Sequence, residues 1–248
     1  MPDLNTAARW TETLLGFIYP PICQLCGNER ATKAGGYVGI NCWQSVKFIR
    51  PPFCQRCGLP FEGAISNEFE CNNCRDQELA FTYARAAVEA KGVVRDVIHR
   101  FKYQQALWFL PFLADLLQRE ALPVLKAADH RWDAIVPVPL HGQKKREREF
   151  NQAELLGAEL AQALQRPLRT DWVKRTLPTP TQTTLSRTER AENVRRAFTR
   201  PSELTLDGQH LIVVDDVFTT GATANAVARE LRRAGAASVV VWAVARGV

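Results

Sequence analysis

Residues 213–223 read VVDDVFTTGAT, a run in which aliphatic residues give way to two acids and then to small hydroxylated residues and a glycine. The aliphatic residues LIVV at 211–214 are typical of a strand that is buried on both faces. We expect Asp215 and Asp216 at its carboxyl end and a helix that begins near Thr223. Ligands of open α/β sheets bind outside the carboxyl ends of the strands, so this stretch is the candidate site.

The loop between the acids and the helix has the composition of a phosphate site. A glycine-bearing loop that enters a helix presents backbone N–H groups and the positive end of the helix dipole. The residues expected at the phosphate are Thr219, Thr220, Gly221, Ala222 and Thr223. No Gly-Lys-Ser/Thr follows, which excludes a Walker loop. The two carboxylates upstream can accept hydrogen bonds from a sugar diol, so the pattern indicates a ribose 5-phosphate; a Mg²⁺-binding phosphoacceptor pair is the alternative.

Further aliphatic runs lie at 133–139 (DAIVPVP) and 238–245 (SVVVWAVA). Helical patterns alternate with them. Asn151 begins a sequence with capping-box spacing, and Gly235 follows a second predicted helix as its C′ residue. This alternation predicts an α/β domain over 84–248, with a mainly parallel sheet flanked by helices.

All seven cysteines fall between positions 23 and 74, which predicts a separate Cys-rich segment over 21–80. The knuckles CQLCG (23–27) and CQRCG (54–58) are nearly identical. The second is completed by Cys71 and Cys74, so Cys54, Cys57, Cys71 and Cys74 are predicted to hold a structural Zn²⁺. The matching place of the first reads Cys42-Trp-Gln-Ser45, so Cys23, Cys26 and Cys42 either recruit water or a histidine as the fourth ligand or bind nothing.

Composition and charge bound the class of protein. An amphipathic helix is predicted within 1–20, without the features of a signal peptide, and no apolar run is long enough for a membrane span. We therefore expect a cytoplasmic protein with no membrane insertion. Segment 131–200 holds 14 Lys and Arg against 8 Asp and Glu, which suits a polyanionic ligand or a solvated basic surface.

The chain resembles the ComF family, which couples a cysteine ribbon to a type I phosphoribosyltransferase domain. The supporting stretches are the ribbon, FKYQQ (101–105), VPVPLH (136–141), REFNQAELL (148–156), RTLPTPTQTTLSRTERAENVRRAF (175–198) and VVDDVFTTGAT. Two departures are Ser45, where the family usually has cysteine, and Glu149, where glycine is common.

The resemblance implies that Asp215 and Asp216 bind the ribose hydroxyls of phosphoribosyl diphosphate and that residues 219–223 hold its 5-phosphate. It also implies that the loop with His141 approaches the diphosphate, which would be neutralised by Mg²⁺ and basic groups. Arg148 is a further candidate contact. Residues 178–196 are either an exposed loop or a hood that closes over the diphosphate, with Gln182, Arg187, Arg190 and Asn193 as candidates.

Three functions remain open at this point. The first is a Mg²⁺-dependent phosphoribosyltransferase with an unidentified acceptor. The second is a protein that binds single-stranded DNA during DNA uptake in natural competence, alongside proteins of the competence machinery, as the resemblance implies. The third is a regulator that senses phosphoribosyl diphosphate. The Lys102-Tyr103 pair and the charged residues 144–146 are either ligand contacts or ordinary surface features.

Overall fold

The computed structural model describes residues 21–61, 63, 69–75, 77–177 and 196–247. The helix expected within 1–20 and the hood candidates Gln182, Arg187, Arg190 and Asn193 lie outside these ranges. The strands are β1 (Ala84–Glu89), β2 (Ala134–Pro137), β3 (Lys174–Arg175), β4 (Phe198–Thr199), β5 (His210–Phe218) and β6 (Ser238–Arg246). The helices are α2 (Ile40–Gln44), α3 (Asn72–Arg75), α4 (Gly92–Tyr103), the 3-10 helix η1 (Leu107–Phe109), α5 (Leu110–Lys126), α6 (Gly142–Arg148), α7 (Gln152–Leu164) and α9 (Ala222–Arg233).

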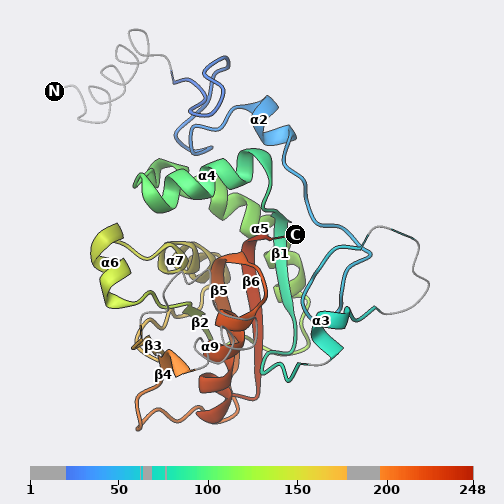
Figure 1. Ribbon diagram of the computed structural model, residues 1–248, viewed down its shortest axis with the longest axis vertical. Helices are drawn as coiled ribbons and strands as arrows, with labels where there is room; N and C mark the ends of the chain where they lie inside the picture. The colour runs from blue at the N-terminus through green and yellow to red at the C-terminus, as the bar shows by residue number, and fades with distance from the viewer. Residues whose placement is uncertain (1–20, 62, 64–68, 76, 178–195, 248) are drawn as a thin grey trace, which may run out of the picture.

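The main sheet is parallel and has the strand order β1-β6-β5-β2 (Figure 1). The aliphatic runs at 133–139, 211–217 and 238–245 form β2, β5 and β6, which confirms the predicted α/β fold. β5 is a central strand and continues through both acids to Phe218, because its last residues still pair with β6. The loop before α9 is therefore shorter than the sequence indicates.

Helices cover both faces of this sheet. The side chains of β5 alternate between the faces: Leu211 and Val213 belong to the core beneath α9, whereas Ile212 and Val214 belong to the core beneath α4, α5 and α7. Burial on both faces explains why the strands are aliphatic without a break. None of the helices described here is long and apolar enough to cross a bilayer.

The predicted helix signals are present. Asn151 is the N-cap of α7, and its side chain accepts a hydrogen bond from the N–H of Ala153. α9 begins at Ala222, and Gly235 follows it with φ of +105°, the left-handed conformation expected of a C′ residue. These caps fix where α7 and α9 begin and end, next to the candidate site.

The cysteine-rich segment wraps around the edge of the sheet. Residues 47–49 pair with β1 through Ile49 N–H to Ala87 O (3.0 Å) and Glu89 N–H to Lys47 O (2.9 Å), which covers the edge strand. The two knuckles consequently lie on opposite faces of the sheet, one near α2 and the other near α3 (Figure 1). The thiols of the second knuckle belong to the same apolar core as the strands beneath α9.

The connection between α6 and α7 places Glu149 in the left-handed region, with φ of +66°. A side chain in this conformation costs about 1–2 kcal/mol, whereas glycine adopts it freely. We therefore expect Glu149→Gly to raise the free energy of unfolding by about 1 kcal/mol in urea titrations, after the greater freedom of glycine in the unfolded chain is subtracted.

The matched control is Glu147→Gly, two residues earlier within α6. Glycine in the last turn of α6 should lower the free energy of unfolding, by up to about 1 kcal/mol. If Glu149→Gly lowered the free energy of unfolding as much as Glu147→Gly, the backbone at Glu149 would not be strained.

Candidate functional site

The two acids of β5 are consecutive residues near the carboxyl end of the strand, and their carboxylates interact with each other. Asp216 is 6% exposed, and Asp215 is partly buried. Asp215 Oδ1 accepts a hydrogen bond from the N–H of Asp216 (2.9 Å), and Asp216 Oδ1 accepts one from the N–H of Val217 (2.8 Å). These bonds fix both carboxylates against the backbone, and each acid keeps a second oxygen for other partners.

Asp216 forms an ion pair with the last turn of α4. Lys102 Nζ lies 2.5 Å from Asp216 Oδ2, and both side chains are largely buried. The sequence left Lys102 as a possible packing residue, but the structure places its ammonium group at the candidate site. The positive charge of Lys102, which α4 brings to this place, thereby compensates the negative charge of the buried Asp216.

The charged form of Asp215 is disfavoured by its surroundings. Burial first, and then the neighbouring charge of Asp216, raises the pKa of Asp215 well above its ordinary value, although Lys102 opposes the shift. On β3, burial lowers the pKa of Arg175, and the attraction between its guanidinium and Asp215 opposes this shift. A ligand that donates hydrogen bonds to such a carboxylate stabilises its charged form.

A basic cavity of about 510 Å³ lies beside Lys102, between the end of α4 and α6. It is lined by Lys102, Tyr103, Gln104, Gln105, Lys144, Glu147 and Arg148. Burial first, and then the nearby cations Arg175 and Arg148, lowers the pKa of Lys144. Positive charges that repel one another around a cavity favour an anionic ligand.

The predicted contacts on α6 have different positions. Arg148 lines the cavity, donates a hydrogen bond to Gln152 Oε1 (3.1 Å) and lies over the Tyr103 ring with its guanidinium carbon 4.9 Å from the ring centroid. His141 is the N-cap of α6, because its Nδ1 accepts a hydrogen bond from the N–H of Gln143 (3.3 Å). The structure thus places Arg148 at the cavity and gives His141 a capping contact.

The loop after β5 consists of Thr219, Thr220 and Gly221. Both threonines are exposed, and the N–H of Ala222 lies 3.4 Å from Thr220 Oγ1. Gly221 has φ of +82°, and a Cβ at this position would lie 2.6 Å from the Phe218 ring. Only glycine satisfies both constraints, so the tight entry into α9 depends on it.

Arg246, at the end of β6, connects this loop to the second cysteine cluster. Its buried guanidinium donates hydrogen bonds to the carbonyl oxygens of Phe218 (3.1 Å) and Thr219 and lies 3.6 Å from Cys57 Sγ. The guanidinium also lies over the Phe218 ring, 4.8 Å from its centroid. The sequence gave no indication of this contact.

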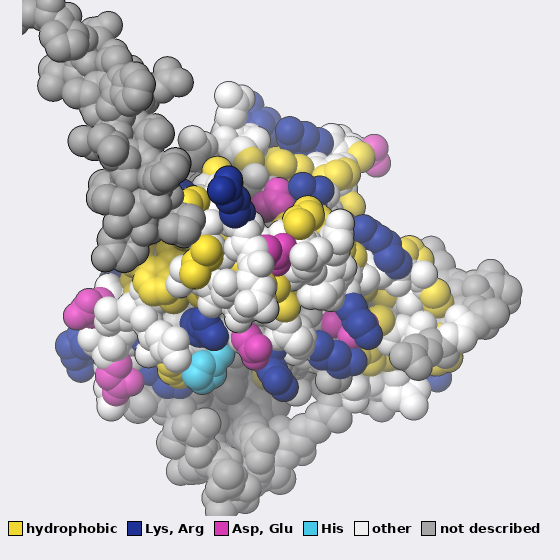
Figure 2. Space-filling model, turned by 90° about the horizontal axis from the view of Figure 1, so that it is seen from above, with side chains coloured by type: hydrophobic (Ala, Val, Ile, Leu, Met, Phe, Trp, Pro, Cys, Tyr) yellow, Lys and Arg dark blue, Asp and Glu magenta, His cyan; other side chains and the backbone are white. Residues whose placement is uncertain are grey.

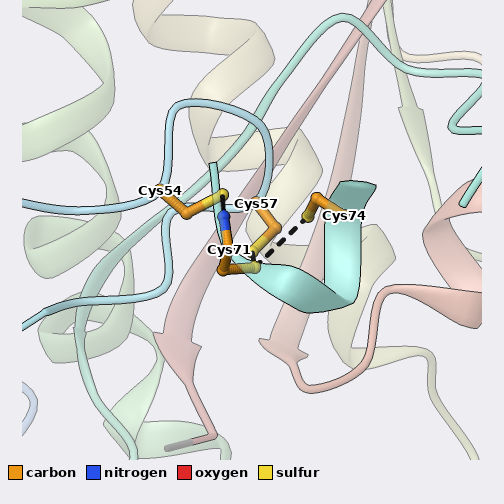
Figure 3. Close-up of side chains that lie close together, drawn as sticks. All are labelled: Cys54, Cys57, Cys71 and Cys74. Atoms are coloured by element: carbon orange, nitrogen blue, oxygen red, sulfur yellow. Dashed lines mark hydrogen bonds between the residues drawn. The ribbon is translucent and has the colours of Figure 1, made fainter. Parts of the chain in front are cut away.

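The second cysteine cluster has the geometry of a tetrahedral zinc site (Figure 3). Cys57 and Cys71 sulfurs lie 3.6 Å apart, as do those of Cys71 and Cys74, close to the edge of about 3.8 Å expected for sulfurs bound to one Zn²⁺. Although burial raises the pKa of Cys54, backbone N–H groups outweigh it and lower this pKa to about 7. Burial raises that of Cys57 to about 11, so a cation is needed for the full set of thiolates.

The first cluster contains Cys23, Cys26, Cys42 and Glu29, whose ligand atoms lie within 4.8 Å of one another. Cys23 and Cys42 sulfurs are 3.7 Å apart. The expected three thiols are therefore together, and a carboxylate lies with them. This cluster is less buried than the second, since Cys26 is exposed.

Sequence reasoning left Lys144 open as a ligand contact or a surface residue, and it passed over Arg175. Lys144 belongs to a run of charges with the appearance of a solvated helix, and Arg175 precedes a long polar segment. The sequence shows that Lys144 and Arg175 are cations, but it does not show that they lie at the site, because that depends on contacts between distant segments. Seen from above the view of Figure 1, basic, acidic and apolar side chains are interspersed on the surface (Figure 2).

A second hollow, of about 700 Å³, lies at the other end of α9 and includes Arg232 and Arg233 among its lining residues. Arg232 donates hydrogen bonds to the carbonyl oxygens of Ala236 and Ala237, and Arg233 pairs with Glu230. Basic residues in the last turn of a helix stabilise its negative end. These contacts explain the positions of Arg232 and Arg233, and no ligand is needed to explain them.

Two family descriptions match the chain, and they agree with this architecture. A double zinc ribbon domain matches residues 14–76, and a phosphoribosyl transferase domain matches residues 151–247. The protein is therefore a zinc-ribbon protein with a phosphoribosyltransferase-type α/β domain.

Relatives along most of the chain identify the family. Competence protein F of Haemophilus influenzae is 32% identical over 195 residues, covering 76% of this chain and 85% of the relative. DNA utilization protein YhgH of Escherichia coli is 32% identical over 228 residues, covering 92% and 97%. This chain belongs to the ComF family. A solved adenine phosphoribosyltransferase from Saccharomyces cerevisiae aligns with 56% of this chain and 69% of its own at 20% identity and a TM-score of 0.35.

The raised pKa of Asp215 leads to a test by protein stability. The folded state favours the protonated acid, so stability declines as pH rises from the ordinary Asp range through the folded-state pKa. We expect Asp215→Asn to be more stable than the natural protein near about pH 8, with the difference shrinking toward about pH 5.

Urea unfolding at a series of pH values measures this difference. The exposed Asp207, in the turn before β5, provides the same substitution away from the site as a control. A destabilised Asp215→Asn protein at neutral pH would contradict the electrostatic description.

Proposed function

We propose that this protein binds phosphoribosyl diphosphate, or a ribose 5-phosphate group, at the carboxyl end of β5. The observation that carries the proposal is the arrangement around Asp215 and Asp216: the start of α9 lies a few residues along the chain, and a basic cavity lies beside the partner of Asp216. A terminal phosphate, a sugar diol and a diphosphate require these three environments in one site.

The 5-phosphate is assigned to residues 219–223. α9 contributes the positive end of its dipole there, and the exposed Thr219 and Thr220 contribute hydroxyl groups. Gly221 allows the main chain to approach the phosphate oxygens closely.

The ribose hydroxyls are assigned to the carboxylates of Asp215 and Asp216. A hydroxyl donor compensates a carboxylate that burial and a like charge disfavour, which is the condition of Asp215. Asp216 forms an ion pair with Lys102, so the position of this acid is defined by α4 as well as by β5.

The diphosphate is assigned to the cavity lined by Lys102, Lys144 and Arg148. An anion there relieves the repulsion that contributes to the lowered pKa of Lys144. Mg²⁺ that arrives with the diphosphate supplies further neutralisation of its charge.

The same site suits two activities. A transferase needs an acceptor nucleophile at C1 of the ribose, where the acids stabilise oxocarbenium character as the diphosphate departs. A regulator needs only the binding step. We propose a role in DNA uptake and utilisation, because relatives carry the names competence protein F and DNA utilization protein. The location that we propose for this role is the cytoplasm.

Binding of single-stranded DNA is a second candidate function. Tyr103 is 63% exposed and lies at the mouth of the basic cavity beside Arg148. An exposed aromatic ring among cations is a platform on which a nucleobase can stack while its phosphates contact the cations.

Isothermal titration calorimetry with phosphoribosyl diphosphate and Mg²⁺ tests the proposed site. Asp215→Asn with Asp216→Asn should abolish measurable binding, since each charge-assisted hydrogen bond contributes about 1.5–3 kcal/mol, or about 10- to 100-fold in affinity. Asp207→Asn should bind as the natural protein does. Unchanged affinity in the double variant, with far-UV circular dichroism showing a folded protein, would remove the assignment.

A fluorescent single-stranded oligonucleotide tests the second candidate. We expect affinity to fall steeply with salt, and the salt slope to be reduced when Lys144, Lys145, Arg187 and Arg190 are neutralised. Tyr103→Ala should weaken binding about 5- to 100-fold if a base stacks there. An oligonucleotide that is not retained at low salt would rule this function out.

A further inference from the structure

The first cysteine cluster lacks the thiol that completes the second. Cys42 and Ser45 have the same spacing as Cys71 and Cys74, so Ser45 stands where a fourth cysteine is expected. Its hydroxyl is a poorer zinc ligand than a thiolate, and Ser45 Oγ donates a hydrogen bond to the carbonyl oxygen of Cys42 (2.7 Å). A tetrahedral site here therefore requires another group as its fourth ligand.

Glu29 supplies a carboxylate at the place where that ligand is needed. Glu29 Oε1 lies 3.6 Å from Cys26 Sγ, and the four ligand atoms of Cys23, Cys26, Glu29 and Cys42 all lie within 4.8 Å of one another. A sulfur and an oxygen bound to one tetrahedral Zn²⁺ are about 3.5 Å apart, from bond lengths of about 2.3 and 2.0 Å. The observed spacing fits one ion.

The surroundings hold the carboxylate in this position. The N–H of Asn41 donates to Glu29 Oε2 (3.0 Å), and the N–H of Cys42 donates to Oε1 (3.2 Å). Glu29 packs across Gly39, where an added Cβ would lie 2.1 Å from Glu29 Cδ. Any other residue at position 39 would displace the Glu29 side chain.

The backbone of the first knuckle differs from the second in a way that brings Glu29 to this place. In the first, the N–H of Cys23 donates to the carbonyl of Glu29, six residues along; in the second, the N–H of Cys54 donates to that of Leu59, five residues along. Glu29 thus takes the structural position of Leu59, in a loop longer by one residue. The positions of the cysteines alone do not reveal that Glu29 corresponds to Leu59.

We infer that Glu29 is the fourth ligand of the first zinc site, which is a Cys₃Glu centre built from Cys23, Cys26, Cys42 and Glu29. The chain then holds two structural zinc ions with different ligand sets. The first centre includes the exposed Cys26, whereas all four thiols of the second are buried. A chelator should therefore remove zinc from the first centre faster than from the second.

Zinc content and X-ray absorption of the purified full chain test this inference. Seven cysteines shared by two zinc ions give an average of 3.5 sulfurs per zinc. Glu29→Ala should hold one zinc per chain, with the sulfur average rising to about 4 because only the second centre remains occupied. That remaining zinc also reports that the variant is folded.

Two further variants separate a ligand from a residue that only caps α2. Glu29→Ala combined with Ser45→Cys restores a thiol at the position equivalent to Cys74, and it should recover two zinc ions with about 4 sulfurs each. Asn28→Ala, an exposed neighbour in the same loop, should keep two zinc ions and the average of 3.5.

Two outcomes would overturn the inference. One is a natural protein with a single zinc ion in an all-sulfur environment, which would mean that the first cluster binds no metal. The other is a Glu29→Ala variant that retains two zinc ions, which would mean that water or another group is the fourth ligand.

Discussion

The like charges of Asp215 and Asp216 at the carboxyl end of β5 are the constraint on which the site depends. Because the two acids are consecutive residues, their carboxylates interact with each other, and cations from other segments of the chain compensate them. Lys102 comes from α4 and Arg175 from β3, so the carboxyl end of β5 collects charges from distant parts of the sequence. An acid pair on a flexible loop would have no such fixed partners, and a ligand would have to order it on binding.

The cysteine-rich segment contributes to this site although it lies outside it. The second cluster is packed into the core beneath α9, and Arg246 extends from beside Cys57 to the carbonyl oxygens of Phe218 and Thr219. A thiolate of a zinc centre carries negative charge, which favours the guanidinium in this buried position. Through Arg246, the second cluster thereby supports the start of the loop that follows β5. The first knuckle packs on the other face, so the segment holds the edge strand β1 from both sides.

Much of the fold could be predicted from local signals, but the assembly of the site could not. Aliphatic runs, the Asn151 cap and Gly235 indicated the strands and helices, because these features act within a few residues. The pairing of Lys102 with Asp216 depends on packing between elements more than a hundred residues apart in the sequence. Glu29 was missed because a carboxylate six residues after Cys23 has no recognised ligand spacing, and only the folded knuckle brings it to the thiols.

The position of a bound ligand tests the central claim most directly. In a crystal structure with phosphoribosyl diphosphate and Mg²⁺, this account predicts a phosphate at the first turn of α9 and sugar hydroxyls within hydrogen-bonding distance of the Asp215 and Asp216 carboxylates. A ligand bound instead in the arginine-lined hollow at the other end of α9, with both acids free of contact, would contradict it.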